Sequence, residues 1–160
     1  MYRLVIFDLD GTLADTLSDL AYSGNTALEH FGYPTHDTEE YRYFVGDGIP
    51  MLIRRILPEN QRSEENISKV KAEFDRVYAE HFDVFTKPYE GISELLERLS
   101  ERGVMTAIAS NKAAEFTERV VSKFFTHRFS AVSGKKRGRS QKPAPRYCLW
   151  NNVTAWCKSR

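Results

Sequence analysis

The first apolar stretch of the chain lies just before Asp8. It starts at Tyr2 and ends at Phe7, and its last four residues, Leu4 to Phe7, include no polar side chain. A continuous apolar run of this length is typical of a strand that is buried on both faces, as in parallel sheets. We therefore predict a central strand of a parallel sheet at this position.

Apolar positions then recur at helical spacing. Leucines, alanines and Phe31 repeat with this period from Thr16 onward, and Gly32 and Pro34 end the pattern. Further helices are expected over about 37–45, 49–57 and 64–82. This long, mostly helical stretch separates the first strand from the next, so it indicates an inserted helical module.

Strand and helix patterns alternate in the second half of the chain. The sequence predicts a helix over about 91–102, a strand from Val104 to Ala109, a helix from Ala113 to Lys123 and a short strand from Phe129 to Val132. This alternation predicts an α/β fold with a doubly wound, parallel sheet. Beyond Ser133, GKKRGRSQK is expected to be a basic loop, and the last 15 residues show no clear period.

Composition and charge narrow the class of protein. The chain has 160 residues, and 41% hydrophobic and 28% charged residues are a normal globular balance. All 22 acidic residues precede residue 119, and the remaining stretch holds 11 of the 23 Lys and Arg. No stretch approaches the roughly 20 apolar residues that span a bilayer, and the N-terminus does not resemble a signal peptide, so we expect a cytoplasmic protein. Cys148 and Cys157 lack the spacing of a disulfide framework or zinc site.

Two carboxylates follow the first predicted strand in the segment FDLDGT, Phe7 to Thr12. Open α/β sheets bind ligands at the carboxyl ends of their strands. At this spacing Asp8 and Asp10 can reach one substrate, one as nucleophile and the other handling a proton, with a divalent cation to hold the paired charge. Gly11 permits the tight turn. A solvated Asp-Gly turn is the structural alternative.

Three more segments contain candidate chemistry. IASNK, Ile108 to Lys112, places Ser110 and Asn111 after the second strand and before a helix, where phosphate binds well, although a plain helix cap explains Ser110 equally well. QKPAP contains Lys142, which a solvated charge run also explains. FVGDGIPMLIRRILPE, Phe44 to Glu59, contains a glycine-bearing loop and two arginines that an ordinary amphipathic helix explains as well.

FDLDGTLADT, IASNK and QKPAP together resemble the first three motifs of the haloacid dehalogenase-like hydrolases, and the KPxP form resembles the phosphoglycolate phosphatase branch. The resemblance implies a Mg²⁺-dependent phosphatase in which Asp8 forms an aspartyl-phosphate and Asp10 is the acid and base. Asp8, the Asp10 carbonyl and the phosphate would bind Mg²⁺. Lys142 would neutralise charge, and Gly11, Thr12, Ser110 and Asn111 would bind phosphate, whereas Asp15 and Thr16 would cap the first helix.

The same resemblance implies a domain organisation. Residues 1–15 and 87–145 would form a Rossmann-like catalytic core, residues 16–86 a helical cap, and residues 146–160 an atypical basic tail. Gly46, Gly48 and Arg55 fall where phosphoglycolate phosphatase caps place a loop and an arginine near substrate, so we expect them to be substrate contacts.

The resemblance ends near Pro145. The fourth motif of the superfamily, an acidic GDxxxD-like segment, is not present after Pro145, where the sequence contains no Asp or Glu. We therefore expect a truncated or frame-shifted C-terminus with C-terminal strands missing, which would leave the FDLDGT strand at an exposed edge. A genuine, lineage-specific tail is the alternative. Weakened Mg²⁺ binding and little turnover would follow.

Other functions remain open at this point. A pyrophosphatase or sugar phosphomutase of the same superfamily would share Asp8, Asp10, Ser110 and Lys142. A non-catalytic phosphate-binding remnant would keep the pocket without turnover. Nucleic-acid binding would depend only on the charge of the tail, because no recognisable module is present, so the expected partner is a small phosphorylated metabolite, with no nucleic acid and no membrane.

Overall fold

The computed structural model describes residues 3–127 and 129–135, which divide into two units. The first unit comprises the chain up to Ala14 and from Pro88 onward, and the second comprises Asp15–Lys87. Two short strands, β2 (Ala14–Asp15) and β3 (Lys87–Pro88), form a two-stranded sheet. None of the helices in these described ranges is long and apolar enough to cross a membrane.

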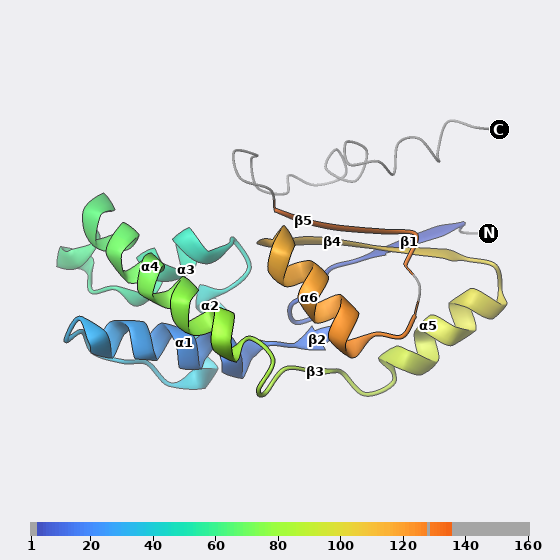
Figure 1. The fold of residues 1–160 in the computed structure, drawn as a ribbon, viewed down its shortest axis with the longest axis horizontal. Helices are drawn as coiled ribbons and strands as arrows, with labels where there is room; N and C mark the ends of the chain where they lie inside the picture. Colours follow the sequence, from blue (N-terminus) through green and yellow to red (C-terminus); the bar gives the residue numbers. More distant parts are fainter. Residues whose placement is uncertain (1–2, 128, 136–160) are drawn as a thin grey trace. The chain divides into compact units, whose positions relative to one another are not determined.

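The first unit is built on a three-stranded parallel sheet in the order β1-β4-β5. Its elements are β1 (Leu4–Phe7), α5 (Ile92–Glu101), β4 (Met105–Ala113), α6 (Ala114–Phe124) and β5 (Ala131–Lys135). Because parallel crossovers are right-handed and both steps proceed in the same direction across the sheet, α5 and α6 lie on the same face (Figure 1). The predicted α/β, Rossmann-like fold with a parallel sheet is confirmed.

The position of β1 differs from the first expectation. Within the described residues β4 is the central strand and β1 is an edge strand. Leu4 to Phe7 are each partly exposed rather than buried on both faces, because only one of the two neighbours that a central strand needs is present in this sheet. Within residues 3–127 and 129–135, the prediction of a central, fully buried strand is therefore wrong, and β1 lies at the edge of the sheet.

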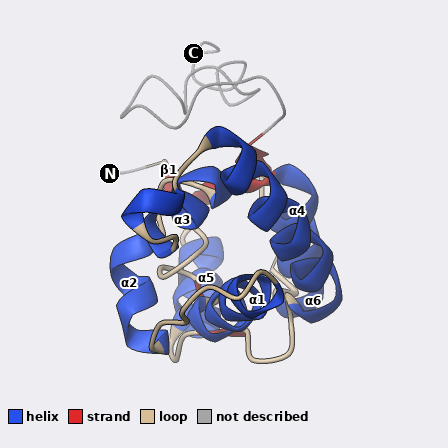
Figure 2. Cartoon of the chain, turned by 90° about the vertical axis from the view of Figure 1, so that its left-hand side faces the viewer, coloured by secondary structure: helices blue, strands red, loops and turns tan. Residues whose placement is uncertain are grey.

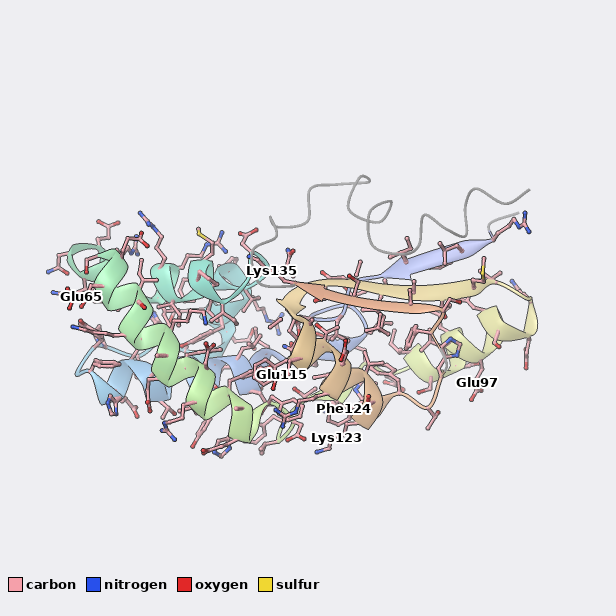
Figure 3. The ribbon with its side chains drawn as sticks, turned by 45° about the horizontal axis from the view of Figure 1, so that its top comes forward. Glu65, Glu97, Glu115, Lys123, Phe124 and Lys135 are labelled. Atoms are coloured by element: carbon pink, nitrogen blue, oxygen red, sulfur yellow. The ribbon has the colours of Figure 1, made fainter. Side chains whose placement is uncertain are left out.

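Two boundaries in the first unit also move. β4 continues four residues beyond the predicted end at Ala109, through a register irregularity between Ala109 and Ala113. β5 includes Gly134 and Lys135, which the sequence placed in a basic loop. A Cβ on Gly134 would lie 2.5 Å from the Ala114 Cα and from Thr117 Oγ1, so only glycine allows β5 to approach α6 this closely. Figure 3 shows Lys135 at the end of this strand.

The second unit consists of helices, as Figure 2 shows in blue. They are α1 (Leu17–His30), η1 (Thr38–Glu40), α2 (Tyr41–Phe44), α3 (Ile49–Ile56), η2 (Glu59–Gln61) and α4 (Glu64–His81). α4 packs against both α1 and α3, and the buried side chains between them include Leu28, Ile53 and Phe74. The predicted helices over 16–31, 49–57 and 64–82 are confirmed, and 37–45 divides into η1 and α2.

A buried carboxylate fastens the two ends of the second unit. Asp19, in the first turn of α1, is fully buried. Its oxygens accept hydrogen bonds from the amides of Phe85 and Thr86 and from Thr86 Oγ1, at 2.6 to 3.2 Å. A buried carboxylate is stable only when such donors satisfy it. Asp19 therefore holds the returning chain against the start of α1.

We expect Asp19→Asn to lower the free energy of unfolding by roughly 2–3 kcal/mol, because the amide NH₂ group would face donors where an acceptor is required. Asp15→Asn is the matched control, since among the described residues Asp15 accepts one weak bond, from the Leu17 amide at 3.3 Å. Denaturant unfolding of the two variants measures the difference. Equal stabilities would contradict the role assigned to Asp19.

A close contact also fixes α2 against α1. Tyr41 is fully buried, its hydroxyl donates to Asn25 Oδ1 at 2.9 Å, and burial raises the pKa of this phenol above its ordinary value. A Cβ on Gly24 would lie 2.4 Å from the Tyr41 hydroxyl oxygen. The Tyr41 ring therefore occupies the space that any side chain at position 24 would need.

We predict that Gly24→Ala destabilises the chain by about 1–2 kcal/mol, since overpacking outweighs the roughly 1 kcal/mol that alanine normally gains in a helix. In a Tyr41→Leu background the same substitution should cost much less. Thermal unfolding of the single and double variants tests this coupling. A stabilising effect of Gly24→Ala in the unmodified chain would show that the contact does not govern packing here.

Candidate functional site

The loop after β1 is a tight turn organised by one carbonyl group. The Leu9 carbonyl oxygen accepts hydrogen bonds from the amides of Thr12, Leu13 and Ala14, at 3.0 to 3.2 Å. Gly11 has a φ of 74°, a conformation that L side chains rarely adopt. Leu9 and Leu13 are fully buried, so their side chains anchor the loop in the core.

This loop presents Asp8 and Asp10 at the carboxyl end of β1. Leu9 points into the core, and the two partly exposed carboxylates flank it in sequence. The Asp8 Oδ1 atom accepts a hydrogen bond from the Leu9 amide at 2.8 Å. Gly11 and Thr12 follow at the exposed tip of the turn. The backbone therefore orients the first carboxylate, and the second follows at the start of the turn.

The end of β4 contributes the second half of the site. Ser110 and Lys112 are almost fully buried, and Asn111 between them is partly exposed. Ser110 Oγ accepts a hydrogen bond from the Lys112 amide at 3.2 Å. Because β4 extends to Ala113, the Ser110 to Lys112 segment lies inside the strand and not at a helix start. Ser110 is therefore not a helix cap, which was the structural alternative.

Strand register brings these two halves together. β1 and β4 are parallel neighbours with Phe7 opposite Ile108, so Asp8 and Ser110 follow the ends of paired segments. Lys112 Nζ lies 2.9 Å from Asp10 Oδ1, in an ion pair that joins residues 102 positions apart. The structure thus brings Asp8 and Asp10, which follow β1, to the β4 end that contains Ser110, Asn111 and Lys112, and Gly11 and Thr12 follow in the same turn.

Lys112 is the functional candidate that the sequence did not identify. In the IASNK segment, the sequence indicated roles for Ser110 and Asn111 and none for the lysine. Its side chain is only 3% exposed, which is rare for a lysine unless an acid pairs with it. The sequence offered one indication of a functional role for Lys112, which is its position in a segment that continues a predicted buried strand.

The glycine-bearing loop lies in the second unit, where Arg55 braces it. The Arg55 guanidinium forms an ion pair with Asp47 and donates to the Phe44 carbonyl oxygen at 2.9 Å. Gly46 and Gly48 have φ values of 113° and 86°, so the loop needs both glycines. The alternative of a simply solvated Arg55 is wrong, because this side chain ties both ends of the loop to α3.

Other predicted features differ in how far the structure describes them. Lys142, the QKPAP segment, Cys148 and Cys157 lie outside the described residues. Of the two expected helix caps, Asp15 accepts from the Leu17 amide, whereas Thr16 makes no side-chain capping bond.

The described residues offer a limited set of metal ligands. Within 3–127 and 129–135, no group of three or more His, Cys, Asp and Glu side chains could hold a metal ion. Asp8 and Asp10 supply two carboxylates and a nearby backbone carbonyl. Mg²⁺ is commonly bound by one or two carboxylates with water and substrate phosphate, so this oxygen-rich pair fits Mg²⁺ and not a soft metal.

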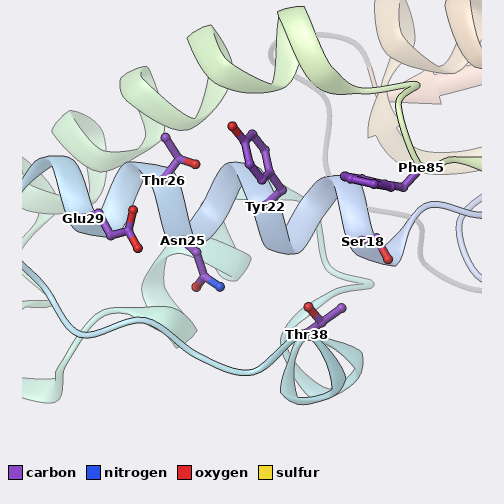
Figure 4. A pocket seen from close by; sticks show the side chains of 7 residues that line it. All are labelled: Ser18, Tyr22, Asn25, Thr26, Glu29, Thr38 and Phe85. Carbon is purple, nitrogen blue, oxygen red and sulfur yellow. The ribbon is translucent and has the colours of Figure 1, made fainter.

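A separate open groove of about 420 Å³ follows α1 in the second unit (Figure 4). Its walls include Ser18, Tyr22, Asn25 and Phe85. Asn25 already bonds to the backbone of His36 on both its amide atoms. Asn25 is therefore already engaged within the unit, whereas Thr26, Glu29 and Thr38 also line the groove.

The fold and the strand-end carboxylates define a Rossmann-like α/β protein of the kind that binds its ligand at the carboxyl edge of a parallel sheet. A comparison with known protein families identifies the family of the chain. The haloacid dehalogenase-like hydrolase family matches residues 5–150, and the chain belongs to this family.

Individual relatives are phosphatases. The chain is 31% identical over 154 residues to the phosphoglycolate phosphatase of Aliivibrio fischeri, covering 92% of this chain and 68% of that protein. It is 36% identical over 149 residues to the enzyme of that name from Pseudomonas syringae pv. tomato, but spans only 54% of its length. By family, the chain is a hydrolase of the phosphatase type.

A solved structure shows the same fold. The crystal structure of a predicted phosphoglycolate phosphatase from Haemophilus somnus aligns with a TM-score of 0.82 at 29% identity, covering 92% of this chain and 70% of that one. The expected resemblance to haloacid dehalogenase-like hydrolases is thereby confirmed.

The Arg55 brace can be tested by the same substitution at two adjacent arginines. Arg55→Lys removes the planar fork that reaches both Asp47 and Phe44, so the loop over 44–48 should open more easily. The pair is partly exposed, so we expect a loss of about 1 kcal/mol at most, or roughly fivefold faster amide exchange in this loop. Arg54→Lys, which affects only a 3.6 Å pair with Glu64, is the control. Identical exchange in both variants would contradict the brace.

Proposed function

We propose that the chain is a Mg²⁺-dependent phosphomonoesterase that acts on a small phosphorylated metabolite of the 2-phosphoglycolate type. The observation that carries this proposal is the pairing of strand ends: Asp8 and Asp10 after β1 lie beside the Ser110 to Lys112 segment of β4. The names of the relatives support the substrate class. The proposal includes a cytoplasmic location.

The chemistry that we propose begins at Asp8. A carboxylate oxygen of Asp8 attacks the phosphorus, and the bond from phosphorus to the substrate oxygen breaks. Asp10 gives a proton to the departing alkoxide and then takes one from the water that attacks the aspartyl-phosphate. Inorganic phosphate and free Asp8 result. The Leu9 amide, which donates to Asp8 Oδ1, helps to fix the direction of attack.

Neutralisation of charge is the main task of the remaining groups, because phosphoryl transfer depends mostly on positioning and electrostatic stabilisation. Gly11 and Thr12 at the turn and Ser110 and Asn111 on β4 are the proposed phosphate contacts. Ser110 lies within β4 and is almost fully buried, so it would contact the phosphate from the protein interior. Lys142 is proposed to neutralise the nucleophile and the phosphoryl group.

A bound Mg²⁺ ion would reduce the repulsion between the Asp8 carboxylate and the phosphate dianion. Asp8 and the Asp10 carbonyl are the proposed ligands. One carboxylate and one carbonyl oxygen would leave the other positions to water and to the substrate phosphate, and a partly hydrated coordination of this kind is common for Mg²⁺ in proteins.

We propose that residues 1–15 and 87–145 are the catalytic core and that residues 16–86 are a cap that governs substrate choice. The compact unit Asp15–Lys87 supports this division. Gly46 and Gly48 are proposed substrate contacts through their backbone, and Arg55 acts by holding that loop through Phe44 and Asp47.

The nucleophile assignment predicts that Asp8→Asn lowers phosphate release from 2-phosphoglycolate by about 10³-fold or more, since the amide cannot attack phosphorus. Release is measured with millimolar Mg²⁺, and p-nitrophenyl phosphate serves as a generic ester. Asp15→Asn makes the same change at a helix cap and should retain activity. If the unmodified chain released no phosphate, or Asp8→Asn matched it, the proposed function would be wrong.

A further inference from the structure

The proposed chemistry assigns no role to Lys112, although its charged side chain is buried beside Asp10. Its side chain is 3% exposed, and Nζ lies 2.9 Å from Asp10 Oδ1, whose side chain is 26% exposed. Desolvating an ammonium group is costly, and the ion pair offsets that cost only when its geometry is good. An apolar side chain would fill the same space without this cost, so stability alone does not account for a lysine here.

The backbone on both sides of the pair is held in place. The Lys112 amide donates to Ser110 Oγ, and the Lys112 carbonyl oxygen accepts from Thr117 Oγ1 of α6 at 3.3 Å. On the other side, Asp10 lies in the turn that three amides tie to the Leu9 carbonyl oxygen. The backbone that carries the ammonium group is therefore held in place, and the Asp10 carboxylate is oriented by its ion pair with that group.

We propose that Lys112 is a positioning residue for Asp10: it grips one carboxylate oxygen, Oδ1, and thereby directs the other toward the oxygen of the leaving group. This inference rests on the proposed function, in which Asp10 exchanges a proton with that oxygen. The contact with Lys112 orients the Asp10 carboxyl group. This matters because a proton donor works only within hydrogen-bonding distance and at a suitable angle. Lys112 itself touches no reacting atom.

Two substrates with different leaving groups distinguish a positioning role of Lys112 from a merely structural one. An alkoxide such as that of 2-phosphoglycolate needs a proton when it leaves, whereas p-nitrophenolate leaves readily without one. Lys112→Met should therefore lower the rate constant of leaving-group release in the first turnover by about 100-fold for 2-phosphoglycolate, and by less than about tenfold for p-nitrophenyl phosphate. The substrate concentration that gives half of the maximal rate should change little. Lys112→Arg, which keeps the cation, should restore part of the loss.

Two comparisons complete the test. Lys123→Met, on the exposed face of α6 (Figure 3), is the matched control and should leave both rates unchanged. Asp10→Asn should show the same dependence on leaving group, and adding Lys112→Met to it should cause no further loss. Equal losses on both substrates, or a Lys112→Met variant that behaves like Lys123→Met, would overturn the positioning role while the proposed function stood.

Unfolding without Mg²⁺ or substrate gives a measurement that does not depend on turnover. Asp10→Asn removes the negative charge 2.9 Å from this buried ammonium group, so the Tm of the variant should fall below that of the Asp10→Asn/Lys112→Met double variant. Additive shifts would show that the two residues are not coupled and would overturn the inference. Coupling together with an inactive unmodified chain would instead reject the proposed function, and with it the catalytic consequence of the pair.

Discussion

The parallel register between β1 and β4 is the constraint on which the rest of the structure depends. It aligns Phe7 with Ile108, so the two segments that follow these residues meet at one edge of the sheet. The chain between them is long, yet it leaves and returns to the first unit at adjacent points, because the Tyr89 amide donates to the Leu13 carbonyl oxygen at 3.1 Å. A change inside residues 15–87 therefore need not alter the register that forms the site.

The charge and burial of the side chains at this edge then determine which chemistry the site can support. Two acidic side chains close together are unfavourable unless a cation or hydrogen-bond donors accompany them. The described structure supplies one donor to Asp8 from the Leu9 amide and one cation to Asp10 from Lys112. The two carboxylates thus contact different groups, an amide and an ammonium, which is consistent with two different tasks for the pair.

Most of the fold could be predicted from the sequence because local patterns determine it. The 3.6-residue period located α1, α3 and α4, and the apolar run before Asp8 located β1. The neighbours of β1 and the length of β4 could not be predicted, since both depend on pairing between distant segments. The Lys112 to Asp10 ion pair was missed for the same reason. Arg55 was identified as a candidate, but its bonds to Asp47 and Phe44 depend on the path of a glycine loop that the sequence leaves open.

The central claim is that Asp8 is a nucleophile at this strand edge, and the covalent intermediate tests it most directly. The unmodified chain is incubated with Mg²⁺ and a phosphomonoester, the acyl phosphate is reduced with borohydride, and the peptides are analysed by mass spectrometry. The account predicts that Asp8 is converted to homoserine, while Asp10 and Asp15 are unchanged. Modification of a different residue, or none in a chain that releases phosphate, would contradict it.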